Sequence, residues 1–434
     1  MQRSQLLNIF FVVLIILIGF GLIMPLIPFY VAEFGGSELL VGLLVASYAA
    51  AQFIGSPVVG RISDRIGRRP ILAICMAGTT LGFLLLAVAE PLGRGLAALL
   101  AAGPGPAPLQ WQNSAVLGVM FFSRLLSGLA GGSITVAQAY VADVTDERNR
   151  TMGMGMIGAS FGLGFIIGPV MGGVLSQWGF AVPAYTAAGL AALNTIAILA
   201  MLPESLTEAR KAELSRRKKQ PVIDFPGMAE KLGRPLLGPL LIIRLVVSLA
   251  GALFMSLFTL WAMDRLGLDA RGTSYLLAYS GLLSIIAQVG LIKPLTRRFR
   301  EANLITWSIV VLAGAMLVWA GTSSLLVLVL MMIPHAFATG VLNTVINSAT
   351  SWAVSPQEMG DALGTSSALE SLSRVAAPTL GGWLMGAAGA WAPGVLGAAL
   401  MGGLAFFAVQ RLIRHPDPPL AEPILLEQEG APVG

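Results

Sequence analysis

The stretch that decides the fold is Gly-Arg-Ile-Ser-Asp-Arg-Ile-Gly-Arg-Arg-Pro at residues 60–70, a short basic loop that holds a single acid. Apolar runs of about 20 residues flank the loop on both sides, and a helix of that length crosses about 30 Å of hydrocarbon. The pattern therefore predicts a tight polar loop between two membrane-spanning helices. On a polytopic membrane protein, such a loop indicates a hinge between helices that move.

The composition of the whole chain agrees with this prediction. Of its 434 residues, 56% are hydrophobic and 11% are charged, whereas soluble domains carry about 25% charged residues. The net charge of +5 comes from basic residues in short loops between apolar runs. That is the positive-inside pattern of membrane proteins, so we expect membrane lipids around the chain and no nucleic-acid partner. The single cysteine, Cys75, lies in an apolar run and excludes both an internal disulfide and a cysteine metal site.

Hydropathy predicts an all-α polytopic membrane protein with twelve transmembrane helices in two pseudo-symmetric six-helix bundles. The first six spans are expected at about 7–31, 39–60, 70–90, 115–141, 152–176 and 181–202. The second six are expected at about 236–263, 273–293, 303–321, 324–353, 360–386 and 390–412. The first span is too long for a signal-peptide core and is expected to be retained.

The charge pattern divides the chain into four regions. An N-terminal bundle at residues 1–202 is followed by a cytoplasmic linker at 203–234, a C-terminal bundle at 235–414 and a disordered cytoplasmic tail at 415–434. The basic residues of the linker are expected on the same side of the membrane as the loop at 60–70. We therefore expect both termini in the cytoplasm of a bacterium, with the chain in its cytoplasmic (inner) membrane.

The two halves repeat one another. Pro169 and its following glycines recur at Pro378, a shift of 209 residues, and Glu147 recurs at Glu358, a shift of 211. The first half holds extra residues around 93–112, between its third and fourth spans. Internal repeats of this kind place a substrate site near the membrane midplane, at the interface of the halves. The repeat therefore indicates transport, with each side of the membrane reached in turn.

The loop at 60–70 resembles the signature loop of the major facilitator superfamily, Gly-x-x-x-Asp-Arg-x-Gly-Arg-Arg. Its defining places are filled by Gly60, Asp64, Arg65, Gly67, Arg68 and Arg69. Residues 19–28, with a spaced Pro-x-x-Pro, resemble the opening of the twelve-span drug:proton antiporters, and residues 139–146 are similar to tetracycline exporters. The resemblance covers nearly all of the chain. It implies a proton-coupled multidrug or tetracycline antiporter that confers antibiotic resistance, with the proton gradient as energy source and no cofactor.

Two motifs carry the expected conformational change. The resemblance implies that Asp64, Arg68 and Asp143 form a charge network that breaks and reforms as the halves rock; the alternative is that the arginines only set topology. In the fifth span, the antiporter motif is carried by Gly164, Gly168, Pro169, Gly172 and Gly173. The family places this motif at the bundle interface, where it limits leak. The alternative is that these glycines only let helices pack closely.

Proton coupling is expected from the few ionisable groups inside the spans, because such groups are costly in lipid. Arg124 lies within a motif that resembles the intramembrane arginine motif of the superfamily, and the repeat shift of 211 pairs it with His335. Glu370 and Arg374 lie one helical turn apart in the eleventh span. The alternatives are a neutral His335 that donates a hydrogen bond between helices, and an internal ion pair between Glu370 and Arg374. Arg244 lies near the start of its span and is expected to snorkel to the interface.

The substrate cavity is expected to be mostly apolar with a few polar anchors, which suits amphiphilic drug-like molecules. The candidates are Phe29, Tyr30, Gln52, Gln138, Phe254, Phe258, Trp261, Gln288, Asn343 and Asn347. The alternative for the aromatics is anchoring at the membrane interface, and for the amides it is hydrogen bonding between helices.

Other functions stay open at this point. The first span has no acid, and the third has none before Glu90, two places where relatives often hold proton-coupling carboxylates. A symporter or uniporter of a small metabolite is therefore an alternative function. A non-transporting sensor is a third possibility. No nucleophile with a base, metal-ligand cluster or phosphate-binding Gly-Lys-Ser/Thr loop is present, so we expect neither an enzyme nor a metal protein. We expect a monomer.

Overall fold

The computed structural model describes residues 2–101, 107–208, 210–211, 225–355 and 358–414. The predicted tail, and residues 209 and 212–224 of the predicted linker, lie outside these residues. The described part of the chain is built from helices and contains no strand, which confirms the all-α fold. Ten helical segments in it are long and apolar enough to cross a membrane.

The first half begins with a broken span. Helix α1 (Gln2–Ile23) and helix α2 (Ile27–Glu33) are joined by the 3-10 turn η1 (Met24–Leu26), which contains Pro25, a residue that cannot donate a helical hydrogen bond. The other elements of this half are α3 (Glu38–Ile66), α4 (Arg68–Ala87), α5 (Ala89–Leu100), α6 (Leu109–Ala130), α7 (Ser133–Val144), α8 (Glu147–Leu175), η2 (Ser176–Trp178) and α9 (Ala181–Met201). The extra residues between the third and fourth spans thus form α5 and extend the start of α6.

The second half contains a helix inside the predicted linker. Its elements are α11 (Phe225–Leu232), α12 (Leu237–Leu266), α13 (Ala270–Ile286), the π-helix η3 (Ala287–Leu291), α14 (Ile292–Arg298), α15 (Glu301–Gly321), α16 (Leu325–Trp352), α17 (Met359–Ala388), α18 (Ala392–Ala408) and the π-helix η4 (Val409–Arg414). Helices α13 and α17 occupy the places of the eighth and eleventh predicted spans but are not among the ten segments above. The helices are therefore consistent with twelve spans.

Local sequence explains several helix boundaries. The Ser37 side chain accepts a hydrogen bond from the backbone N–H of Leu40 at 3.4 Å and begins α3, and Asp146 accepts one from Asn149 at 2.9 Å and begins α8. These are N-cap contacts, which satisfy free donors at a helix start. Gly67 has a φ of +129° and separates α3 from α4. Glycine alone adopts this backbone conformation at little cost.

The structure divides into two compact units. Unit 1 comprises Met1–Ile223, Ser256–Gly281 and Arg374–Gly389, and unit 2 comprises Asp224–Met255, Leu282–Ser373 and Ala390–Gly434. Helices α12 and α17 therefore contribute to both units, and α13 is also divided. The predicted bundles at 1–202 and 235–414 are a different division, based on the sequence repeat, and stay a prediction.

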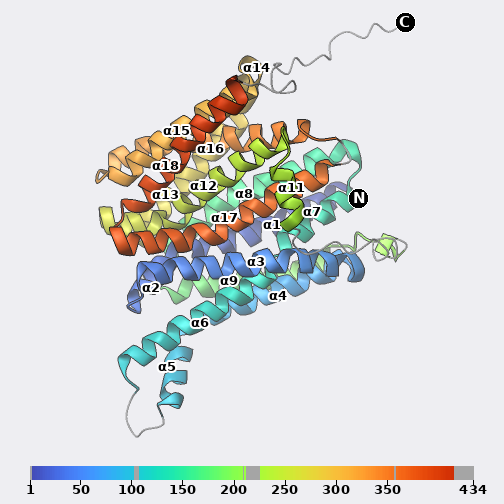
Figure 1. Cartoon of the computed structure of the whole chain (residues 1–434). Helices are drawn as coiled ribbons and strands as arrows, with labels where there is room; N and C mark the ends of the chain where they lie inside the picture. The colour runs from blue at the N-terminus through green and yellow to red at the C-terminus, as the bar shows by residue number, and fades with distance from the viewer. Residues whose placement is uncertain (1, 102–106, 209, 212–224, 356–357, 415–434) are drawn as a thin grey trace, which may run out of the picture. The chain divides into compact units, whose positions relative to one another are not determined.

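Glycines let the helices of unit 1 approach closely. A Cβ at Gly164 would overlap Leu17, and one at Gly168 would lie 2.8 Å from the Cα of Gly21, so α8 packs backbone to backbone against α1. The carbonyl of Pro378 on α17 likewise lies against Gly42 on α3. In Figure 1, α3, α4, α6 and α9 run side by side in this unit, and α5 lies along the start of α6.

Unit 2 has its own apolar core. Leu237, Leu241, Ala362 and Leu369 form a buried cluster, and Met228 and Leu232 of α11 pack against it. The linker helix is thus attached to unit 2 by apolar contacts. Ion pairs add to this attachment: Lys231 pairs with Asp361 at 2.6 Å, and Arg234 pairs with Glu358 at 3.0 Å.

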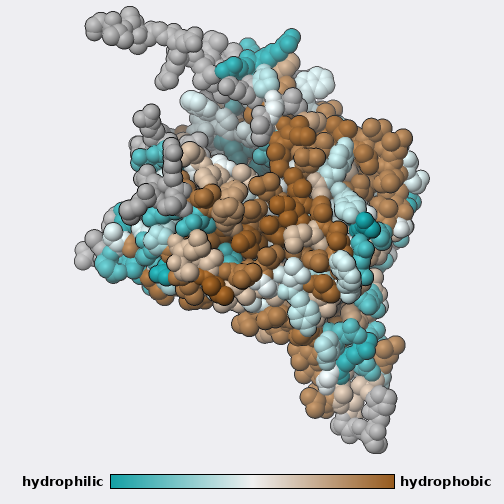
Figure 2. Space-filling model, turned by 180° about the vertical axis from the view of Figure 1, so that it is seen from behind, coloured by the Kyte–Doolittle hydropathy of each residue, from teal (hydrophilic) through white to brown (hydrophobic). Residues whose placement is uncertain are grey.

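Large apolar side chains are exposed along the spans. Leu81, Phe122, Leu193, Ile196, Trp307, Leu326 and Phe406 are each more than half exposed. Hydrophobic residues predominate on the face seen in Figure 2. A soluble protein rarely exposes apolar surface of this extent, so these side chains face lipid, and the chain is an integral membrane protein.

Candidate functional site

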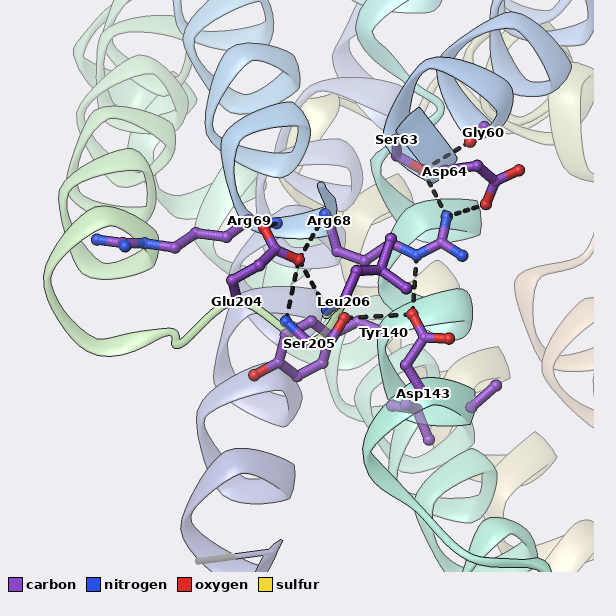
Figure 3. A network of polar contacts seen from close by, with 12 residues as sticks. Gly60, Ser63, Asp64, Arg68, Arg69, Tyr140, Asp143, Glu204, Ser205 and Leu206 are labelled. Carbon is purple, nitrogen blue, oxygen red and sulfur yellow. Dashed lines mark hydrogen bonds and ion pairs between the residues drawn. The ribbon is translucent and has the colours of Figure 1, made fainter. Parts of the chain in front are cut away.

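Arg68 joins the helices around the signature loop in unit 1 (Figure 3). Its Nη1 lies 2.6 Å from Asp64 and donates to the Ser63 hydroxyl at 2.7 Å, and its Nε donates to Asp143 at 2.9 Å. The Arg68 side chain is 7% exposed, whereas those of Asp64 and Asp143 are 34% and 18% exposed. A guanidinium can hold two carboxylates at once because its five donors form a planar fork. The structure thus brings together the three residues that the sequence grouped, and their gating role stays a prediction.

Glu204 completes this network, and the sequence analysis missed it. Its carboxylate accepts hydrogen bonds from the backbone N–H groups of Arg68 at 2.9 Å and Arg69 at 3.2 Å. It also accepts from Ser205 and Leu206 at 3.0 and 3.1 Å. Since the N-cap residue of α4 is a glycine without a side chain, Glu204 supplies the missing cap. A negative charge at a helix N-terminus is also favoured by the helix dipole.

Gly67 is required here for two independent reasons. Its positive φ disfavours any residue with a side chain, and a Cβ at this position would overlap the Glu204 carboxylate. We call the set of Ser63, Asp64, Arg68, Asp143 and Glu204 the gate network. Glycine at position 67 is therefore what allows a linker carboxylate to reach the start of α4.

The remaining loop residues have separate surroundings. The Arg69 guanidinium donates to the carbonyl of Leu199 on α9, and Arg65 is exposed at the end of α3. The carbonyl of Gly60 accepts from the Ser63 hydroxyl at 2.7 Å. An open cavity of about 410 Å³ lies beside Arg69, lined also by Gln5 and Asn8. All of its lining residues belong to unit 1.

The fifth-span motif spans several contacts within unit 1. Gly164, Gly168 and Gly172 face α1, where Pro169 also lies near Gly21, and Gly173 lies against Ser274 of α13. Gly164, Gly168 and Gly172 thus lie in the contact between α1 and α8, and Gly173 joins α8 of the first half to α13 of the second half. This placement agrees with either role given above, sealing or packing.

Glu370 forms an ion pair with Arg244 in unit 2. The Nη1 of Arg244 also donates to the Asn343 side-chain carbonyl at 2.9 Å. Arg244 is buried. It lies seven residues after the start of α12, about 10 Å along the helix axis, which is too deep for simple snorkelling. Arg244 is therefore not the snorkelling residue that the sequence predicted, and its contact with Glu370 was not among the sequence predictions.

Arg124 is buried on α6 in unit 1 and forms no ion pair within the described part of the chain. Its guanidinium carbon lies 6.0 Å from the ring centre of Tyr48 and 5.6 Å from that of Phe83. The Nε and Nη2 atoms have no hydrogen-bond partner among the described residues. The motif arginine is therefore held by aromatic faces. Such cation–π contacts stabilise a desolvated charge by about 2 kcal/mol.

His335 is buried in unit 2, where its ring centre lies 4.2 Å from that of Phe254. Its Nε2 lacks a hydrogen-bond partner within the described residues. The residue that the repeat pairs with Arg124 thus shares two properties with it: an aromatic neighbour and an unsatisfied nitrogen.

The cavity candidates fall into two groups. Phe258 and Trp261 are fully buried, Phe254 and Tyr30 are buried, and Phe29 and Gln52 are half-buried. The exposed candidates are the four polar residues Gln138, Gln288, Asn343 and Asn347. Gln52 donates to the carbonyl of Gly131 at 3.1 Å, which is the inter-helix contact expected of an amide. A substrate role for any of them stays a prediction.

Long lipid-facing helices, a sequence repeat and ion pairs within the spans define a polytopic membrane transporter. The model of the Major Facilitator Superfamily matches residues 9–351 and, in a second match, residues 240–434. The chain belongs to the Major Facilitator Superfamily, whose members are transporters and not enzymes.

The chain is similar to several resistance proteins and to solved transporters. The class C tetracycline resistance protein of Escherichia coli is 28% identical over 367 residues, 84% of this chain and 85% of the relative. Multidrug resistance protein 2 of Bacillus subtilis (strain 168) is 27% identical over 370 residues, 85% of each chain. The solved structure of the nucleoside transporter NupG has a TM-score of 0.69 at 15% identity, covering 94% of this chain and 99% of that one. This last likeness shows the fold alone.

Proposed function

We propose that the chain is a proton-coupled antiporter that exports amphiphilic drug-like compounds by alternating access. The relatives named above are described as tetracycline and multidrug resistance proteins, which supports export. The proton gradient would supply the energy, and no cofactor is required. The chain would work as a monomer in a bacterial cytoplasmic membrane, with both termini in the cytoplasm.

The observation that carries the proposal is the cluster of Glu370, Arg244 and Asn343. It is the one carboxylate-containing ion pair inside the described spans away from the helix ends. Glu370 lies eleven residues after the start of α17, about 16 Å along its axis. An ionisable group at such a depth is costly, so it marks an ion pathway more often than a structural contact.

The cluster has the chemistry for reversible protonation. In the state described here, the Glu370 carboxyl group contacts the Arg244 guanidinium. When Glu370 takes up a proton, the ion pair is lost, but the Asn343 carbonyl remains as an acceptor for the arginine. A buried arginine that loses its only partner is costly. Asn343 therefore lowers the cost of the protonated state and makes both states of Glu370 accessible.

The gate network supplies the second element of the proposal. Asp64 is partly exposed and is held by Arg68 within unit 1. In the alternate state, we propose that Asp64 leaves Arg68 and accepts hydrogen bonds from a helix N-terminus of the second half. Asp143 and Ser63 would keep Arg68 satisfied during that exchange. The other contacts of the arginine would thus let one carboxylate leave at low cost.

The test is substrate-driven proton movement. Protein in liposomes that contain a pH-sensitive dye is given tetracycline, a lipophilic cation or an aromatic carboxylate, and the internal pH is followed. The proposal predicts a substrate-dependent proton flux that is lost in Glu370→Gln. Glu90→Gln is the matched control, because Glu90 is half exposed and pairs with the exposed Arg94. Transport of a compound with no proton movement would refute antiport.

A further inference from the structure

We propose that the buried cluster around Arg124 binds the anionic group of an aromatic substrate. The inference rests on the proposed export function and names the class of substrate: a carboxylate or sulfonate joined to an aromatic body. All of the residues involved belong to unit 1.

Arg124 carries a charge without a counter-ion among the described residues. Arg124 is 4% exposed, and the titratable groups that act on it are the phenols of Tyr48 and Tyr30. A guanidinium stays charged in proteins, and a buried charge is normally paired. Aromatic faces offset part of the cost, but they accept none of its hydrogen bonds. Arg124 therefore lacks a counter-ion that its surroundings would otherwise be expected to contain.

A group of unsatisfied donors lies near Arg124. The buried Tyr30 hydroxyl and the buried Ser127 hydroxyl have no hydrogen-bond partner among the described residues, and neither do Nε and Nη2 of Arg124. Ser127 lies one turn after Arg124 on α6, and Tyr30 is within electrostatic reach of the guanidinium. Buried polar groups are nearly always hydrogen-bonded. Each of these groups can donate, so the ligand that satisfies them must accept.

The surroundings of the Arg124 guanidinium are apolar. Tyr48 and Phe83 flank the guanidinium, and the Phe20 ring centre lies 5.6 Å from that of Tyr48. These rings come from three different helices, α1, α3 and α4. An aromatic body that stacks among them would place its acidic group next to Arg124. A small inorganic anion would leave the rings without a partner.

A second guanidinium lies nearby. Arg374 on α17 acts electrostatically on the same Tyr48 ring as Arg124. Unlike Arg124, Arg374 is exposed. Two arginines that act on one tyrosine form a positive environment, and α6 and α17 belong to different halves of the repeat. An anion held by both would contact helices that move relative to each other in an alternating-access cycle.

Unit 2 provides the contrast. Its buried arginine, Arg244, already has a carboxylate and an amide as partners. Arg244 in unit 2 is thus neutralised from within the chain, as Arg68 is in unit 1, whereas Arg124 is not. We infer that protons are handled in unit 2 and the substrate anion in unit 1.

The experiment is equilibrium binding with three probes that share one fluorophore. Dansylglycine carries a carboxylate, dansylglycinamide is its neutral analogue and dansylcadaverine is a cation. Binding to the purified protein in detergent is followed by dansyl fluorescence at constant ionic strength. We expect dansylglycine to bind the wild type at least about tenfold more tightly than the amide, because a charge-assisted bidentate contact is lost in the amide.

The variants separate a binding role from a packing role. Arg124→Gln should weaken dansylglycine binding about tenfold and change amide binding less than threefold, and Arg124→Lys should retain part of the preference. Arg94→Gln, at an exposed arginine, should change nothing. Amide binding also reports that each variant is folded. Equal affinities for the carboxylate and the amide, a preference for the cation, no binding of dansylglycine, or an equal loss for all probes in Arg124→Gln would each overturn the proposal.

This test is independent of proton coupling, because equilibrium binding needs no gradient. Carboxylate-selective binding without proton flux would refute antiport but keep the anion site. Proton flux driven by cations alone would keep antiport and refute the anion site.

Discussion

Replacement of Glu204 should loosen the start of α4, and the size of the effect follows from its contacts. The carboxylate accepts four backbone hydrogen bonds, two from the first turn of α4 and two from the linker. Loss of an N-cap costs about 1 kcal/mol, and each further bond contributes about 0.5 kcal/mol at a partly exposed site. Glu204→Ala should therefore lower the free energy of unfolding by about 2 kcal/mol.

Glu204→Gln should have about half of this effect, since one amide oxygen can still accept while the NH₂ group faces a backbone N–H. The assay is thermal unfolding followed with a thiol-reactive dye, because Cys75 is the chain's only cysteine and is 4% exposed in the folded state. About 2 kcal/mol corresponds to a fall in Tm of about 4 °C. Glu208→Gln is the control, because the Glu208 side chain is 88% exposed and pairs with Lys211. An unchanged Tm in Glu204→Ala would refute the capping role.

Three further predictions follow from the contacts described above. Asp143→Asn should lower the free energy of unfolding by about 2 kcal/mol, because it removes a charged acceptor of Arg68. It should also lower the transport rate in liposomes. A wild-type transport rate with an unchanged Tm would contradict a gating role. Gly168→Leu should prevent close packing of α8 on α1 and abolish folded protein on gel filtration. Gly155→Leu should be tolerated, because a Cβ there meets no atom within 4 Å. Equal yields of folded protein for the two variants would show that the fifth-span glycines do not set the spacing of α1 and α8. The hydrogen bond from Arg234 lowers the pKa of Glu358 below its ordinary value of 4.5, so this contact stabilises fully above about pH 4.5 and is lost as the pH falls through the lowered pKa. Proteolysis of the linker should therefore increase in the wild type as the pH falls through that lowered pKa, and it should increase less in Glu358→Gln. A wild-type linker that is equally resistant at pH 7 and at a pH well below that pKa would contradict this.

The sequence predicted the helices well because membrane spans carry a strong local signal. Twenty apolar residues in a row have few alternatives to a helix, since every backbone group must be satisfied within lipid. The contact between Asp64 and Arg68 in the loop at 60–70 could also be predicted, because the two residues are four positions apart, about one helical turn. Both features depend on residues that are close in the sequence.

The parts that the sequence missed depend on residues that are far apart. Glu204 contacts the backbone of Arg68 across 136 residues, and nothing in the local pattern of the linker indicates that contact. Arg244 and Glu370 lie on two helices whose rotation about their axes sets which side chains meet, and hydropathy does not fix that rotation. The repeat did carry long-range information, because it paired Arg124 with His335, two residues that both have unsatisfied nitrogens.

The central claim is that Glu370 carries the coupled proton, and the most direct measurement compares two modes of transport in the same liposomes. One mode is exchange of labelled for unlabelled substrate, which needs no net proton movement, and the other is substrate accumulation driven by a pH gradient. Glutamine imitates a protonated glutamate that cannot release its proton. The account predicts that Glu370→Gln retains exchange at the wild-type rate and loses gradient-driven accumulation. Accumulation at the wild-type level in Glu370→Gln would contradict it.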